Sequence, residues 1–155
     1  MAKEMIVEKS ISINKPSSEV FAYLKLARNQ EQFSVWNMKD PNKETKTIGE
    51  DGTVGFTYSW NSKDKSVGVG SQTISKIVDG QRIEYELNFE KPMKNTGNSA
   101  FIIQSIDENQ TTVTWDFRGP TKFPMSLFSG LISKMLGKDI AQSLLNLKNK
   151  LEQTS

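Results

Sequence analysis

The sequence predicts an α+β domain in which an antiparallel sheet packs on one long C-terminal helix. Three observations lead to this prediction. From residue 43 to 118, short segments of alternating apolar and polar residues are separated by turn residues, the pattern of consecutive hairpins. Residues 5–13 alternate in the same way, and residues 127–151 repeat apolar residues at steps of three or four. Strands that follow one another directly favour an antiparallel sheet over parallel βαβ units.

The first strand is predicted over residues 5–13 because Val7, Ile11 and Ile13 share one parity while polar residues take the other. Pro16 then favours a helix start, since its fixed φ suits the first turn. The stripe of apolar residues that continues this first helix is Val20, Phe21, Leu24 and Ala27.

A second short helix is predicted over residues 29–35, with Phe33 and Trp36 facing inward. The segment Trp36–Pro41 is expected to be a loop, because the residue before a proline resists the helical conformation.

Each strand of the central region has one apolar side. The predicted inward residues are Val54, Phe56, Tyr58 and Trp60, then Ile83, Tyr85, Leu87 and Phe89, then Val113, Trp115 and Phe117. The opposite parity places Glu86, Asp116 and Arg118 on a solvated outer face, so no carboxylate pair is positioned for general acid–base chemistry. Gly68 and Gly70 lie inside a strand, where glycine marks a bulge or a close approach.

The C-terminal helix is predicted to have about 25 residues and a length of roughly 40 Å. Gly130 and Gly137 weaken it and mark a bend or a close contact. The lysines of this helix are interpreted as a solvated face, and the alternative is a surface that binds acidic lipid headgroups. These lysines are Lys134, Lys138, Lys148 and Lys150.

Only the long helix is large enough to cover the apolar side of the sheet, and the two short helices would close one end. A curled sheet is not filled by one helix, so we expect a cavity of roughly 300–1,000 Å³ between them. The alternative is that the side chains expected to line this cavity simply pack in the hydrophobic core. The candidate ligand-binding residues are Trp36, Met38, Phe56, Tyr58, Trp60, Tyr85, Leu87, Met93, Trp115, Phe117, Phe128, Ile132 and Met135.

Composition excludes several kinds of chemistry. The 155 residues include no cysteine and no histidine, which removes disulfides, thiol nucleophiles, Ser–His–Asp triads and most transition-metal sites. No catalytic residue, metal or other cofactor is therefore predicted. The net charge of +2 disfavours nucleic acid as a partner. No signal peptide and no integral membrane segment is recognised, so a cytoplasmic protein is expected.

The order of these segments resembles the START-like (SRPBCC) superfamily, the polyketide cyclase/dehydrase and lipid-transport group. The segments that carry the resemblance are residues 11–21, 36–41, 52–55, 68–70 and 137–148. The resemblance covers residues 1–155 as a single domain. It implies the helix-grip fold, with a curved sheet of about seven strands wrapped around the C-terminal helix and a ligand cavity between them. It implies no single reaction.

The leading functional prediction is binding or transport of a small hydrophobic molecule, such as a lipid, a polyketide or another aromatic. This function needs no catalytic residue. The first alternative is a polyketide cyclase/dehydrase-type enzyme acting in the same cavity, which requires an ionisable group inside it. The second is a protein–protein module of the chaperone-activator kind, which requires a filled core and an exposed apolar patch.

Overall fold

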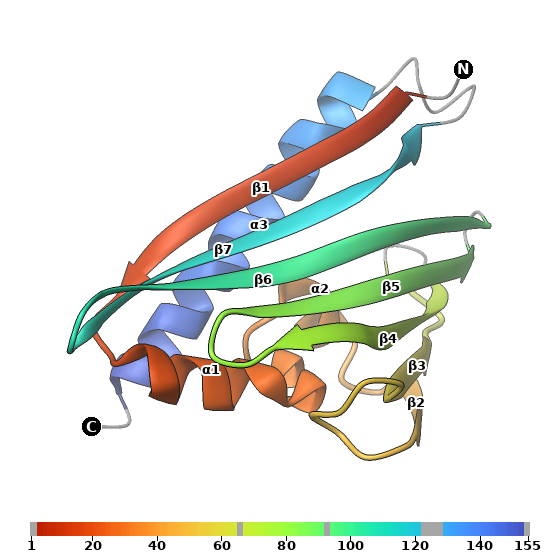
Figure 1. Ribbon diagram of the computed structural model, residues 1–155. Helices are drawn as coiled ribbons and strands as arrows, with labels where there is room; N and C mark the ends of the chain where they lie inside the picture. Colours follow the sequence, from red (N-terminus) through yellow and green to blue (C-terminus); the bar gives the residue numbers. More distant parts are fainter. Residues whose placement is uncertain (1–2, 65–66, 92–93, 122–128, 154–155) are drawn as a thin grey trace.

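The structure, a computed structural model, describes residues 3–64, 67–91, 94–121 and 129–153. Figure 1 shows an antiparallel sheet that curls around the C-terminal helix, with the short helices at one end. The elements in chain order are β1 (Lys3–Ile13), α1 (Ser17–Lys25), the 3₁₀ helix η1 (Ala27–Gln32), α2 (Val35–Lys39), β2 (Glu44–Ile48), β3 (Thr57–Asn61), β4 (Val69–Val78), β5 (Arg82–Lys91), β6 (Asn95–Asp107), β7 (Gln110–Thr121) and α3 (Ser129–Glu152).

The seven strands form one sheet in the order β1-β7-β6-β5-β4-β3-β2, with every neighbouring pair antiparallel. Strands β2 to β7 are therefore consecutive hairpins, and β1 adds to the far edge beside β7. This architecture confirms the predicted α+β fold. Helix α3 packs mainly on β1, whereas α1 crosses the ends of β6 and β7 (Figure 1).

The predicted first helix is confirmed. Pro16 is the N-cap with an extended backbone, and its carbonyl accepts hydrogen bonds from the Glu19 and Val20 N–H groups, each at 3.1 Å. Val20 and the two apolar residues that follow it on the same stripe, Phe21 and Leu24, are buried. The helix thus closes one end of the interior, as expected.

The predicted second helix is wrong in its bounds. The chain instead forms two short helices, η1 and α2, and α2 includes Trp36 and Met38, which were expected in a loop. Pro41 restricts only Asp40, whose backbone is extended, so the helix continues to Lys39. A side chain of α3 also stabilises the start of α2, because the Ser143 hydroxyl accepts a hydrogen bond from the Val35 N–H at 2.9 Å.

Val54 is the second correction, since it was expected on the inner face of a strand. It lies before β3 and is 62% exposed. The reason is Gly55, whose φ of 98° breaks the extended run between Val54 and Phe56. Phe56 is nevertheless buried, in agreement with the prediction.

The core centres on Trp115, whose indole stacks on Phe101 at a centroid distance of 4.6 Å and meets Phe33 at 5.9 Å. Its Nε1–H donates a hydrogen bond to the Ser99 hydroxyl at 2.9 Å, so its polar atom is satisfied inside the core. Phe33 is fully buried, as expected.

Gly68, predicted inside a strand, instead lies just before β4 and has a φ of 71°, which glycine adopts without strain. Gly70 and Gly137 are at the predicted close approaches. A Cβ at Gly70 would lie 2.6 Å from the Asn88 carbonyl oxygen and 2.8 Å from the Trp60 ring. A Cβ at Gly137 would lie 3.1 Å from the Lys9 side chain, where α3 packs on β1. Gly70 brings the strands together more closely than a side chain would allow, whereas a side chain at Gly137 would require only the flexible end of Lys9 to move.

The third correction concerns Asp116 on the outer face of the sheet. Glu86 and Arg118 are exposed as predicted, but Asp116 is only 1% exposed. Asp116 Oδ2 forms an ion pair with Arg118 Nε at 3.4 Å, and burial raises the pKa of the carboxyl despite this partner. Arg82 also lies near enough to act on Asp116. Long side chains can cover a short one on a solvated face, an effect that strand parity does not reveal.

Candidate functional site

Half-buried aromatic side chains gather on the inner face of the sheet. The Trp36 ring of α2 lies 5.4 Å from that of Phe117 on β7, and the Trp60 ring of β3 lies 6.1 Å from that of Phe89 on β5. All four pack against the core but stay partly exposed. The predicted residues Trp36, Trp60 and Phe117 therefore pack against the core and stay partly accessible.

Between these two aromatic pairs, the inner face has two neighbouring positions without side chains. Leu87 pairs with Gly97 on β6. A Cβ at Gly97 would lie 2.8 Å from the Arg118 carbonyl oxygen of β7, and a Cβ at Gly119 would lie 3.7 Å from Gly97 Cα, so the two strands approach closely here. By strand alternation, Leu87, Gly97 and Gly119 share the inner face with Phe117. We call this region, bounded by Leu87, Phe89 and Phe117, the glycine recess.

The other predicted site residues occupy three kinds of environment. Phe56, Tyr58, Tyr85, Leu87 and Trp115 are buried in the core cluster. Met38 is 52% exposed and Met135 is 61% exposed, so Met135 is not part of the core. Met93, Phe128 and the side chain of Ile132 lie outside the described residues.

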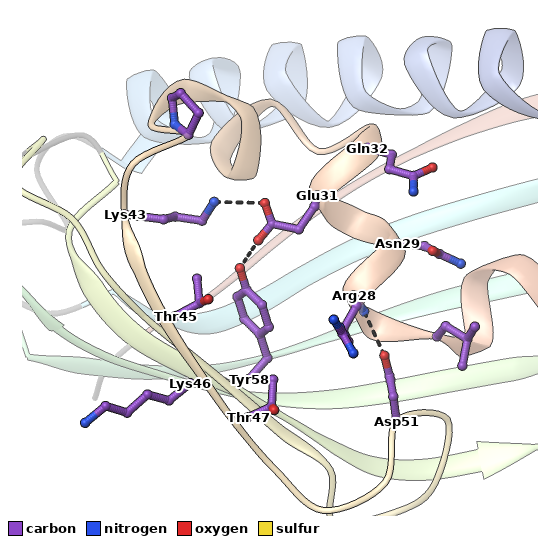
Figure 2. Close-up of a pocket in the computed structure, with 12 residues that line it drawn as sticks. Arg28, Asn29, Glu31, Gln32, Lys43, Thr45, Lys46, Thr47, Asp51 and Tyr58 are labelled. Carbon is purple, nitrogen blue, oxygen red and sulfur yellow. Dashed lines mark hydrogen bonds and ion pairs between the residues drawn. The ribbon is translucent and has the colours of Figure 1, made fainter.

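A cleft of about 750 Å³ opens between β2–β3 and η1 (Figure 2), whereas the cavity was predicted between the sheet and the C-terminal helix. Charged and polar side chains supply most of its walls. Its lining residues are Leu26, Arg28, Asn29, Glu31, Gln32, Pro41, Lys43, Thr45, Lys46, Thr47, Asp51 and Tyr58. Apart from Tyr58, none of them was predicted as a site residue, because no spacing in the sequence relates η1 to β2.

Tyr58, Glu31 and Lys43 form a hydrogen-bonded cluster in this cleft (Figure 2). The Tyr58 hydroxyl donates to Glu31 Oε1, and Lys43 Nζ donates to Glu31 Oε2 at 2.9 Å. Lys43 Nζ also contacts the carbonyl oxygens of Asn37 at 2.9 Å and Asp40 at 3.5 Å, at the end of α2. The cluster connects β3, η1 and the end of α2, because Tyr58 and Lys43 each donate a hydrogen bond to the Glu31 carboxylate.

Asp51 is similarly engaged on the opposite wall of the cleft. Its carboxylate accepts hydrogen bonds from the backbone N–H groups of Ala27 at 2.8 Å, Arg28 at 3.1 Å and Gly52 at 2.8 Å. Two of these donors are in the first turn of η1, so Asp51 acts as its cap. Both carboxylates of the cleft therefore stabilise the position of η1.

The described residues contain neither a metal-binding cluster of side chains nor a helix that could span a membrane. In residues 3–64, 67–91, 94–121 and 129–153, no group of three or more Asp or Glu side chains could hold a metal ion. In the same part of the chain, no helix is long and apolar enough to cross a membrane.

Solved structures with this fold come from proteins of different kinds. The Aha1 dimer from Colwellia psychrerythraea is 16% identical, covers 95% of this chain and 96% of its own, and superposes with a TM-score of 0.64. A START superfamily protein from Mycobacterium smegmatis is 11% identical, with coverages of 97% and 99% and a TM-score of 0.67.

Norcoclaurine synthase from Thalictrum flavum, in complex with dopamine and hydroxybenzaldehyde, is 8% identical. The match covers 99% of this chain and 90% of the synthase, with a TM-score of 0.72. At these identities the structural matches establish the fold alone.

No curated protein sequence matches the chain. The family model for polyketide cyclase/dehydrase and lipid transport, however, matches residues 4–152. That description supports a module that binds a hydrophobic ligand. The chain therefore belongs to the polyketide cyclase/dehydrase and lipid-transport family and has the helix-grip fold of the START superfamily.

Proposed function

We propose that this protein binds a small, mainly apolar molecule at the glycine recess and sequesters or carries it. The proposed ligand is a lipid, a polyketide or another aromatic compound. The observation that carries the proposal is the pair of glycines, Gly97 and Gly119, lying between half-buried aromatic side chains on the inner face. Aromatic walls offer a large contact area at a small entropic cost.

The expected affinity follows from the apolar area that such a ligand would bury. Burial of about 300 Å² at about 25 cal/mol per Å² gives roughly 7–8 kcal/mol before the costs of association. Those costs reduce the net value, so micromolar dissociation constants are expected. No catalytic group is needed for this function. The Tyr58 ring lies 6.4 Å from that of Trp60, and its hydroxyl is already bonded to Glu31, which favours a binding module over an enzyme.

The test is to fill the recess with a side chain. A Cβ at Gly119 would lie 3.4 Å from the Thr96 carbonyl oxygen and 3.7 Å from Gly97 Cα, which are close but tolerable contacts, so Gly119→Leu is expected to fold. The probe is 2-isopropenylnaphthalene, titrated while tryptophan fluorescence is recorded. We expect micromolar binding to the natural sequence and at least about tenfold weaker binding to the variant.

The matched control is Thr112→Leu, which adds the same side chain to the outer parity of β7. It should leave the affinity unchanged. Binding that is equally strong in Gly119→Leu would refute the recess as the site, and no binding to the natural sequence would refute the proposed function for aromatic ligands. Native mass spectrometry of freshly purified protein would then identify any ligand that co-purifies.

A further inference from the structure

Two polar groups in the apolar interior have no hydrogen-bond partner in the described part of the chain. They are the hydroxyl group of Tyr85 on β5 and the side-chain amide nitrogen of Gln30 on η1. Tyr85 is 1% exposed and Gln30 is 6% exposed, so water at the surface does not satisfy them. Buried polar groups are nearly always paired, and each exception calls for a partner.

Tyr85 lies near the glycine recess, and the Gln30 side chain lies near the Tyr85 hydroxyl. Tyr85 is two residues from Leu87 on the same face of β5, and it pairs with Ser99, which in turn pairs with Phe117. Tyr85 is therefore one cross-strand row from the recess. Burial raises the pKa of the Tyr85 hydroxyl, and the Asp51 charge adds to this effect, whereas the interaction with the nearby Gln30 side chain lowers the pKa to a smaller extent. The hydroxyl therefore remains protonated at neutral pH.

A protonated phenol and a primary amide nitrogen are both hydrogen-bond donors. The atom that satisfies two neighbouring donors is an acceptor oxygen with two lone pairs, as in a carbonyl group. The surrounding side chains are apolar, with Phe101 in edge-to-face contact with Tyr85 at 6.0 Å. A fixed polar point inside an apolar pocket is the usual means of orienting a ligand.

We propose that Tyr85 and Gln30 bind the carbonyl oxygen of an otherwise apolar ligand, so that the protein prefers aromatic or aliphatic ketones and esters over hydrocarbons. This inference rests on the proposed function, because it places the carbonyl end of the ligand at the inner end of the same recess.

The experiment compares two probes of the same shape. These are 2-acetylnaphthalene and 2-isopropenylnaphthalene, in which a CH₂ group replaces the carbonyl oxygen. Their dissociation constants are measured for the natural sequence, for Tyr85→Phe and for Gln30→Met. A net hydrogen bond corresponds to about a 3- to 10-fold change in affinity, so each variant should weaken ketone binding by that factor and leave hydrocarbon binding within about twofold.

The control variant is Tyr23→Phe, which removes a phenol that donates to Gln32 Oε1 at 2.9 Å on the outside of the short helices. It should change neither affinity. A second readout does not depend on stability: the carbonyl ¹³C resonance of labelled 2-acetylnaphthalene should move downfield on binding to the natural sequence and less so in Tyr85→Phe.

Two results would overturn the inference in distinguishable ways. If both probes bind but neither Tyr85→Phe nor Gln30→Met affects the ketone selectively, neither side chain binds the carbonyl oxygen, and the proposed function stands without this inference. If neither probe binds to the natural sequence, the proposed function fails for aromatic ligands and the inference fails with it.

Discussion

Replacing Glu31 with alanine should destabilise the protein by about 2 kcal/mol. Glu31 accepts hydrogen bonds from Lys43 Nζ and from the Tyr58 hydroxyl. A bond to a charged group contributes about 1.5–3 kcal/mol, and breaking a fully buried pair costs about 3–5 kcal/mol. The Lys43 side chain is only 4% exposed, but Glu31 is 36% exposed, so solvent screening lowers the value toward about 2 kcal/mol.

The assay is urea denaturation combined with calorimetry. For a chain of 155 residues, about 2 kcal/mol corresponds to a decrease in Tm of about 4–8 °C. The same substitution in a Lys43→Met background completes a double-mutant cycle. Because Lys43 no longer needs a carboxylate there, Glu31→Ala should cost at least about 1 kcal/mol less.

Glu19→Ala is the control, since Glu19 pairs with Lys15 at 3.8 Å on the outside of α1 and is 45% exposed. It should cost no more than about 0.5 kcal/mol. An equal loss from Glu31→Ala in both backgrounds would show that Glu31 and Lys43 are not coupled, and the view that the cluster fixes η1 and α2 to β3 would have to be abandoned.

Two further predictions concern the sheet. Gly70→Ala should destabilise the protein by about 1–3 kcal/mol in chemical denaturation, because the new methyl group would collide with the Asn88 carbonyl and the Trp60 ring; an unchanged midpoint would contradict the close approach. Asp116 has a pKa raised by burial, so its contribution to stability is present below its unfolded-state pKa near 3.8 and is lost as the pH rises through the folded-state pKa. The stability of Asp116→Asn relative to the natural sequence should therefore increase as the pH rises above about 3.8, and a difference that is constant with pH would contradict the assignment.

Strand alternation was sufficient to predict much of the sheet. It correctly assigned Ile83, Tyr85 and Leu87 to the interior, because a period of two follows directly from backbone geometry. The same argument failed for Val54, where the positive φ of Gly55 interrupts the strand. It also failed for Asp116, because alternation states which face a side chain takes and not what covers it there.

The candidate site could be predicted only in part. The aromatic character of the inner face is a property of the strand sequences, and Trp36 and Phe117 were expected to line a pocket. Their contact at 5.4 Å depends on how α2 packs over the sheet. The polar cleft had no signal, since Glu31, Lys43 and Tyr58 come from three elements whose distance apart is set by folding.

Local backbone periods and composition account for the order of strands and helices, the apolar face of the strands and the absence of histidine and cysteine chemistry. Three features depend instead on how distant segments pack: Gln30 lies near the Tyr85 hydroxyl, Gly97 approaches Gly119, and Asp116 is covered. Each is a contact between residues far apart in the chain, and such contacts arise from the curvature of the sheet and the packing of helices on it, which no local pattern encodes.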